Sequence, residues 1–271
     1  MATRLFETKE HASCYQKYRF SPPQEIQDLI LSYLGEKLPK PYVLAVDVGC
    51  GTGQGTRIMA PHFKTVLGTD ISEAQIEEAK KAPGFSNITF SVAPAEEVPV
   101  KDGSVDLLTA WTAVHWFDTE KFLKEVDRVL KPHGCLAFFT YLPEAEAHYK
   151  NKTEQMSKIF AESQDFLEPY QHEKVRLVKS AYKEIFEAIP YTDKKRIVDM
   201  DMKITMTLAD LIGLIKSFSM FQIFHSQEPE KANEFIKTTE QKFLDVMEVS
   251  SNETEIEVCL KNVLVLATKP K

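Results

Sequence analysis

The sequence predicts an α/β protein with a doubly wound, mostly parallel sheet of seven strands and a helical cap. Three observations lead to this fold class. Apolar runs alternate with stretches of helical periodicity in the first half of the chain, as in successive βαβ units. The first run, residues 43–48, ends in a glycine-rich turn. The second half is mostly amphipathic helix, and it closes on the strand-like run 255–269.

Local signals place the elements of the first half. Two helices are predicted within residues 1–39. Ser72 opens an S-x-x-Q capping pattern, which predicts a helix over 73–81. Another helix begins near Thr119 and ends before Lys131-Pro-His-Gly134. Strands are predicted at the apolar runs between them, namely 43–48, 65–71, 88–92, 105–111 and 135–141.

The second half changes character. A helical insertion is predicted over 150–189, and every second residue from 198 to 206 is apolar, which indicates a half-buried strand. Helices around 208–224 and 230–248 precede the last strand. We therefore expect a single domain, 1–271, with N-terminal helices over 1–39, a ligand-binding core over 40–142, a cap over 143–194 and a completing segment over 195–271.

Composition and charge argue against several classes of protein. The formal net charge of −7 offers no basic surface for nucleic acid or anionic lipid. No apolar run reaches transmembrane length and no signal peptide is apparent, so the cytosol is the expected compartment. The four cysteines form no C-x-x-C pair and no cluster has ligand spacing, so no metal is expected. We expect a monomer or weak homodimer with neither a nucleic-acid nor a membrane partner.

The glycine-rich turn is the strongest functional signal. It reads Asp47-Val-Gly49-Cys-Gly51-Thr-Gly53, and the next strand ends on Asp70. An acid in that place can hydrogen-bond both hydroxyls of a ribose. The G-x-G-x-G spacing is shorter than the dinucleotide pattern, and Asp47 puts negative charge beside the loop, which suits a cationic ligand. S-adenosylmethionine therefore fits better than NAD.

Several stretches resemble the class I S-adenosylmethionine-dependent methyltransferases, most strongly over residues 40–142. The resemblance implies a Rossmann-like methyltransferase fold, S-adenosylmethionine as cofactor and S-adenosylhomocysteine as product. The stretches that carry it are 47–53, 70–72, Ala95-Glu-Glu-Val-Pro99 with Asp102-Gly-Ser-Val-Asp106 and, as in the branch that contains trans-aconitate methyltransferase, 15–22, His115-Trp116-Phe117 and 217–219.

Candidate cofactor contacts follow from these motifs. Gly49, Gly51 and Gly53 allow close backbone approach to the methionine and ribose portions. Asp70, followed by Ile71, takes the ribose, although an acid there also suits a helix cap. The resemblance implies that Ala95 and Glu96 meet the adenine, although Pro94 replaces the Asp of many relatives, and Glu96 suits a solvated surface equally well.

The resemblance also implies that the segment with Tyr15, Tyr18 and Arg19 folds over the cofactor. Arg19 would pair with the methionine carboxylate, because its fork matches a carboxylate. An ordinary surface arginine beside packed aromatics is the alternative. The lid role predicts hydrogen exchange before about residue 25 that slows when cofactor binds.

The loop after the fourth strand carries Thr112, counted among the cofactor contacts, and the candidate catalytic residues His115 and Trp116. Aromatic faces there can accommodate a sulfonium and exclude water. The expected function is methylation of a small molecule, with a carboxylate oxygen as acceptor. Alternatives are a hydroxyl, amine or thiol acceptor with His115 as base, or a catalytically silent cofactor-binding protein.

Overall fold

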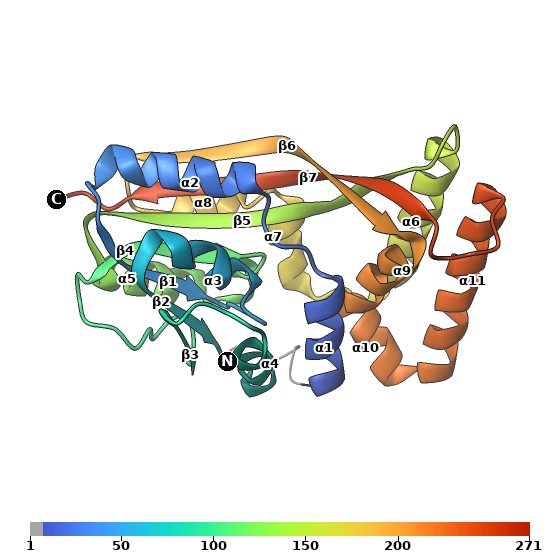
Figure 1. Ribbon diagram of the computed structural model, residues 1–271, viewed down its shortest axis with the longest axis horizontal. Helices are drawn as coiled ribbons and strands as arrows, with labels where there is room; N and C mark the ends of the chain where they lie inside the picture. Colours follow the sequence, from blue (N-terminus) through green and yellow to red (C-terminus); the bar gives the residue numbers. More distant parts are fainter. Residues whose placement is uncertain (1–7) are drawn as a thin grey trace.

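The protein, described here from a computed structural model over residues 8–271, is built on one seven-stranded sheet of order β3-β2-β1-β4-β5-β7-β6 (Figure 1). Strands β1 to β5 pair in parallel, and β7 runs antiparallel to both of its neighbours. The predicted doubly wound sheet is confirmed. Its strands are β1 (Tyr42–Val48), β2 (Phe63–Asp70), β3 (Ile88–Val92), β4 (Val105–Trp111), β5 (Leu130–His148), β6 (Lys194–Thr207) and β7 (Glu255–Thr268).

Helices cover both faces of the parallel part. One face packs on α5, whose Phe122, Val126 and Val129 are fully buried. Burying each such side chain contributes about 1.5–3 kcal/mol. The other face packs on α2, through Ile30 and Leu34. The helical elements of this part are α2 (Gln24–Lys37), α3 (Gln54–Met59), α4 (Glu73–Lys81), α5 (Thr119–Val129), α7 (Arg176–Lys179) and α8 (Lys183–Ala188), with 3₁₀ turns η1 (Ala60–His62), η2 (Val114–Trp116), η3 (Glu168–Tyr170) and η4 (Glu173–Val175).

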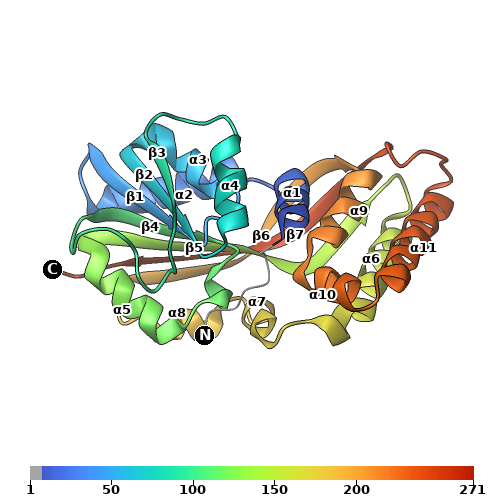
Figure 2. The ribbon, with the colours of Figure 1, turned by 90° about the horizontal axis from the view of Figure 1, so that it is seen from below.

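A cap of helices lies on the part of β5, β6 and β7 that extends beyond the parallel strands (Figures 1 and 2). It has its own apolar core, in which Phe160, Leu211 and Phe243 are buried together. The N-terminal helix α1 joins this layer because it packs against α9 as well as against α4. The cap helices are α1 (Lys9–Tyr18), α6 (Thr153–Leu167), α9 (Leu208–Ser217), α10 (Ser219–Gln227) and α11 (Pro229–Met247).

The structure corrects several predicted elements. The strand predicted over 135–141 spans Leu130–His148. The helix predicted over 208–224 is two helices, because the backbone of Phe218 is extended (φ −69°, ψ 139°). In the predicted insertion, Ala181 and Tyr182 have positive φ, so the helix breaks there and α8 packs on the core sheet.

The predicted alternation over 198–206 contains a break in register. The pairing of β6 with β7 shifts between Ile197 and Met200, and Val198 is 37% exposed. Beyond the shift, Met202 and Met206 point into the cap core. A bulge of this kind bends a strand and re-aims its side chains. Among the helices of residues 8–271, none is both long and apolar enough to cross a bilayer.

Candidate active site

The glycine loop follows β1 at the carboxyl end of the parallel strands. Gly49, Gly51 and Gly53 all have positive φ, which glycine adopts without strain. A Cβ at Gly49 would lie 2.8 Å from the Cβ of Ala113, so the loop approaches the segment after β4 closely. Gly53 caps α3 and lies against the ring of Phe90. Of the three glycines, only Gly49 and Gly51 line the cavities beside the loop, which are described next.

Three cavities meet at this edge of the sheet. The first, called here the loop cavity, has a volume of about 710 Å³ and contains eight of the predicted residues. The cap cavity, about 830 Å³, lies between the sheet and the cap helices. The junction cavity, about 510 Å³, lies beside the glycine loop. The predicted residues in the loop cavity are Gly49, Gly51, Asp70, Ile71, Ala95, Glu96, Thr112 and Trp116.

Tyr15 and Thr112 line all three cavities, and Trp116 lines the loop and cap cavities. Thr112 has a φ of 52°, which is strained for a β-branched residue, and its N–H donates to Phe139 O at 2.7 Å. This strained turn presents Thr112 at the point where the cavities join. A group transferred between a ligand in the loop cavity and one in the cap cavity would pass here.

The other residues of the predicted N-terminal lid separate. Tyr18 lines none of the three cavities and lies against Gly213 of α9, where an added Cβ would come within 2.3 Å of its ring. Its predicted contact with the cofactor is therefore corrected to packing on the cap. Arg19 lines the cap and junction cavities. Tyr15, Tyr18 and Arg19 are close together in the sequence, but their side chains leave the end of α1 in different directions and contact different neighbours.

Arg19 is a partly buried cation with no carboxylate partner among residues 8–271. Its Nε donates to Ser217 Oγ at 2.8 Å, and its Nη2 to Ser217 O at 3.2 Å. The guanidinium carbon lies 4.9 to 5.6 Å from the ring centroids of Tyr15, Tyr141 and Phe218. Burial lowers the pKa of the guanidinium, which nevertheless stays protonated. The groups around the guanidinium are a hydroxyl, a carbonyl and aromatic ring faces, and none of these carries a negative charge. The positive charge of Arg19 can therefore pair with a bound anion.

His115 lines the cap cavity, and its Nδ1 lies 2.9 Å from Tyr182 Oη. Burial lowers the pKa of His115 to about 3, with Arg19 and Lys174 adding to the effect. The imidazole is therefore neutral at physiological pH. No local pattern in the sequence indicates the contact between His115 and Tyr182, because the two residues are 67 positions apart.

The loop with His115 and Trp116 is held from the opposite side by Lys174 of η4. Its Nζ donates to Trp116 O at 2.6 Å and to Phe117 O at 3.3 Å. The Trp116 ring is tilted against the ring of His115 and meets His172 edge-on, at centroid distances of 4.6 and 5.4 Å. The segment predicted as insertion therefore shapes the wall on which both candidate catalytic residues lie.

Asp47 lies one layer beneath the glycine loop and lines none of the three cavities. It is fully buried, and it accepts from Thr56 Oγ1 at 2.6 Å and Thr109 Oγ1 at 3.1 Å. Burial raises the pKa of this carboxyl to about 7. The expected direct contact with a ligand is thus replaced by a buried acid whose charge varies near neutral pH.

Asp70 accepts from Gly51 N and from Ser72 N, both at 2.9 Å. The acid therefore links the glycine loop to the start of α4, where Ser72 accepts from Gln75 N. A carboxylate has about four acceptor sites, so these two bonds are compatible with ribose contacts as well. Both sequence-based readings, ribose acid and helix-start acid, agree with this geometry.

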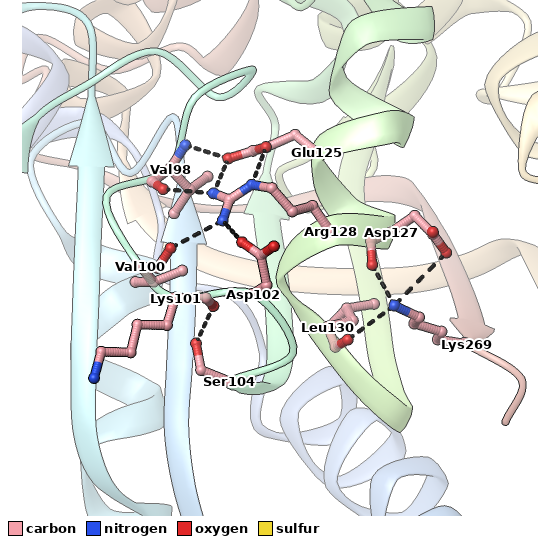
Figure 3. Close-up of polar contacts among 10 residues, drawn as sticks. All are labelled: Val98, Val100, Lys101, Asp102, Ser104, Glu125, Asp127, Arg128, Leu130 and Lys269. Atoms are coloured by element: carbon pink, nitrogen blue, oxygen red, sulfur yellow. Dashed lines mark hydrogen bonds and ion pairs between the residues drawn. The ribbon is translucent and has the colours of Figure 1, made fainter.

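The loop between β3 and β4, residues 93–104, is held in place by an ionic network around Arg128 (Figure 3). Arg128 pairs with Glu125 at 2.6 Å and with Asp102 at 2.5 Å, and it donates to Val98 O and Val100 O. Glu125 in turn accepts from Val98 N. Just before this segment, Glu96 accepts from Asp118 N at 2.7 Å. The loop that carries Ala95 and Glu96 is therefore anchored to both ends of α5.

Unpartnered buried polar atoms indicate where a ligand belongs. Gln75 Oε1 faces the loop cavity, whereas Gln54 Nε2 and Trp111 Nε1 border the junction cavity. Such atoms are costly unless something bonds them. A nucleoside over Asp70 and a zwitterionic tail beside the glycine loop would satisfy them, so these residues fit S-adenosylmethionine. Among residues 8–271, no group of three or more His, Cys, Asp or Glu could hold a metal ion.

Comparisons with known proteins identify the class of protein that has this fold. A family model described as "Methyltransferase domain" matches residues 46–138. An uncharacterized methyltransferase of Schizosaccharomyces pombe is 30% identical over 198 residues, which are 71% of this chain and 73% of that protein. Trans-aconitate 2-methyltransferase of Deinococcus radiodurans is 34% identical over 126 residues, 45% of each chain.

A solved structure from Anaeromyxobacter dehalogenans, assigned as a type II methyltransferase, superimposes with a TM-score of 0.70 at 22% identity, covering 90% of this chain and 97% of that one. The fold is therefore shared over nearly the whole length of both proteins. The chain belongs to the class I S-adenosylmethionine-dependent methyltransferases. S-adenosylmethionine is its methyl donor.

Asp70→Ala is expected to weaken binding of both S-adenosylmethionine and S-adenosylhomocysteine by about 1–3 kcal/mol, because charged hydrogen bonds are lost and the glycine loop loses its tie. Calorimetric titration measures this. Asp28→Ala, which removes an exposed acid of α2 that lines none of the three cavities, is the matched control and should bind normally. Equal affinity for wild type and Asp70→Ala would contradict the role of Asp70.

Binding of S-adenosylmethionine is expected to release a proton near pH 7 and to tighten as pH rises through that value. The bound cation favours ionised Asp47, whose carboxyl has a pKa of about 7 in the free protein. In the free protein, the contribution of Asp47 to stability falls as pH rises from about 4 to 7, because this carboxyl keeps its proton in the folded chain and loses it in the unfolded chain. Calorimetry in buffers of different ionisation enthalpy counts the proton, and Asp47→Asn should abolish its release.

Proposed function

We propose that the enzyme transfers a methyl group to the carboxylate of a small molecule bound in the cap cavity. The observation that carries this proposal is Arg19, a partly buried cation without a carboxylate partner among residues 8–271, on the wall of that cavity. A carboxylate would neutralise it through charge-assisted hydrogen bonds. The similarity to trans-aconitate 2-methyltransferase, which its name describes as acting on a carboxylic acid, supports the same acceptor class.

The surroundings also suit a carboxylate better than an alcohol or an amine. A carboxylate is ionised at neutral pH and needs no base. An alcohol or a protonated amine needs one, and a His115 with a pKa of about 3 is a very weak base. His115 is therefore proposed to position the acceptor. This favours the carboxylate over the alternative in which His115 removes a proton.

Bound S-adenosylmethionine supplies an electrophilic methyl group. The chain's part is to align the acceptor and to keep the site dry. Tyr15, Thr112 and Trp116 lie where the loop and cap cavities join, so an acceptor oxygen held from the cap side faces the nucleoside side there. Attack by a carboxylate on a sulfonium methyl removes two opposite charges. Exclusion of water by aromatic walls therefore favours the reaction, and fixed geometry lowers its entropic cost.

The experiment is product identification. The enzyme is incubated with methyl-labelled S-adenosylmethionine and a panel of small carboxylic acids, alcohols, phenols and amines. Methyl esters release labelled methanol on treatment with base, whereas methyl ethers and methylamines do not. Base-labile label on acids only is the expected result. Base-stable label on an alcohol, a phenol or an amine would overturn the carboxylate assignment.

With a carboxylic acid and saturating cofactor, the rate is expected to stay flat above about pH 6, because the acid is then fully ionised and a His115 with a pKa of about 3 does not titrate there. His115→Ala should lower kcat/KM by about 10- to 100-fold through lost positioning while keeping the flat profile. Initial rates across pH measure both. A wild-type rate that rises through about pH 6.5, with that limb lost in the variant, would make His115 a base.

A further inference from the structure

The wall of the cap cavity that α6 and the segment after it form carries two side-chain amides. Gln164 of α6 and Gln171, which follows η3, both line the cavity. The Nε2 of Gln164 is buried without a hydrogen-bond partner among residues 8–271. Such a donor costs free energy unless a bound molecule accepts from it. The described protein contacts do not account for this amide.

The charges around the cavity limit what the amide can receive. Arg19 is the single formally charged side chain among the residues that line it, since His115 is neutral there. One carboxylate of an acceptor can therefore be compensated. A second carboxylate would be desolvated without a cation, which is strongly unfavourable. The substrate named for trans-aconitate 2-methyltransferase carries three carboxylates, so the similarity to that enzyme supports only the accepting group and not the rest of the acid. A ketone, ester, amide or hydroxyl oxygen carries no charge and can still accept from Gln164.

The rest of the wall is mixed. Phe160 lies one helical turn before Gln164 on α6, and Val178, Leu214 and Met220 come from the facing elements. These apolar side chains suit methylene or ring carbon atoms. Polar side chains also line the cavity, and among them the Tyr141 hydroxyl is buried without a hydrogen-bond partner among residues 8–271, with the Tyr141 ring against the Arg19 guanidinium. The acceptor that fits therefore has a carboxylate for Arg19, a second polar group for Gln164 and an apolar remainder.

We propose that the acceptor is a monocarboxylic acid that carries a second, uncharged hydrogen-bond-accepting group, which Gln164 binds at a distance from Arg19. This inference rests on the proposed function, because it takes the carboxylate at Arg19 as given. It adds a specificity-determining residue and separates two classes of acid. Oxo and amide acids are substrates of choice, and dicarboxylic acids are not.

The test measures equilibrium binding of matched acids to the protein loaded with S-adenosylhomocysteine. Straight-chain acids from hexanoic to decanoic are each compared with the acid bearing a ketone next to its terminal methyl and with the dicarboxylic acid of equal length. At the best length the oxo acid should bind about 3- to 10-fold more tightly than the plain acid, as one buried hydrogen bond allows. The dicarboxylic acid should bind more weakly than the oxo acid.

Gln164→Leu should abolish the preference for the oxo acid and leave binding of the plain acid unchanged. Gln241→Leu, on the exposed face of α11, is the matched control and should keep the preference. An oxo acid that never binds better than the plain acid, a preference that survives Gln164→Leu, or tightest binding of the dicarboxylic acid would overturn the inference.

Assaying methyl esters in the same mixtures tests the proposed function separately. Binding of oxo acids with a preference that requires Gln164, but without ester formation, supports this inference and refutes carboxylate methylation. Ester formation on plain and oxo acids at equal rates, with equal binding, supports carboxylate methylation and refutes the role of Gln164.

Discussion

Gly51→Val is expected to abolish cofactor binding, weakening it by at least about 100-fold, or ~2.7 kcal/mol. Gly51 has a φ of 54° and lines both the loop and the junction cavity. A Cβ there would lie 3.7 Å from Gln75 Oε1 and 3.8 Å from Tyr15, so there is space for it, although the positive φ strains any side chain at this position. The valine side chain would instead occupy the path of the nucleoside and its tail. Calorimetric titration with S-adenosylmethionine measures the loss.

Gly103 offers a matched control for backbone strain. Its φ of 57° nearly equals that of Gly51, and a Cβ there would meet nothing within 4 Å. Gly103→Val should thus cost a similar ~1–2 kcal/mol of stability and leave cofactor affinity unchanged. Comparing melting temperatures of the two variants isolates the shared strain. Normal cofactor binding by Gly51→Val would show that the cofactor does not lie beside this loop.

Arg19→Met is expected to lower kcat/KM for a carboxylic acid by about 100- to 1,000-fold, because the acceptor anion would be buried without its cation. Affinity for S-adenosylmethionine should fall less, since Gln54 Nε2 and Trp111 Nε1 also border the junction cavity. The melting temperature should not fall, because the substitution removes a partly buried cation that no carboxylate of residues 8–271 compensates. Initial rates, calorimetry and thermal melts give the three values.

Arg19→Lys separates charge from geometry. It keeps a cation but loses the fork, and partial recovery of activity is expected. If Arg19→Met weakens the cofactor more than the acid, Arg19 serves the methionine carboxylate, as the family resemblance implies. The carboxylate clamp in the cap cavity would then be wrong.

Local motifs were the part of the site that sequence could predict. The glycine turn after β1, the acid that ends β2 and the helix that starts after Ser72 depend on neighbours in the chain, and all lie where expected. Gly53 and Tyr18 illustrate the limit. Each belongs to a motif, but Phe90 and Gly213, distant in sequence, decide where it packs.

Residues of the cap cavity were hardest to predict. Nothing near Gln164 or Tyr182 in the sequence distinguishes a cavity amide or a histidine partner from ordinary helix surface or core. Their roles arise because α6 and the break at Tyr182 meet β4 and β5 in space. Helical periodicity reports that a face is apolar, but not which element covers it. The break between α9 and α10 at Phe218 could not be predicted either, since the apolar residues around Phe218 continue the helical periodicity.

The three long strands that carry both the parallel core and the cap have a mechanical consequence. Because β7 is hydrogen-bonded to β5 on one side and to β6 on the other, before and after the register shift in each pairing, rotating the cap as a block would bend three paired strands at once. The connection between the parallel core and the cap is therefore three paired strands and not a flexible hinge. Passage of substrates must then rely on smaller pieces attached at one side, namely α1 and the turns around η3 and η4.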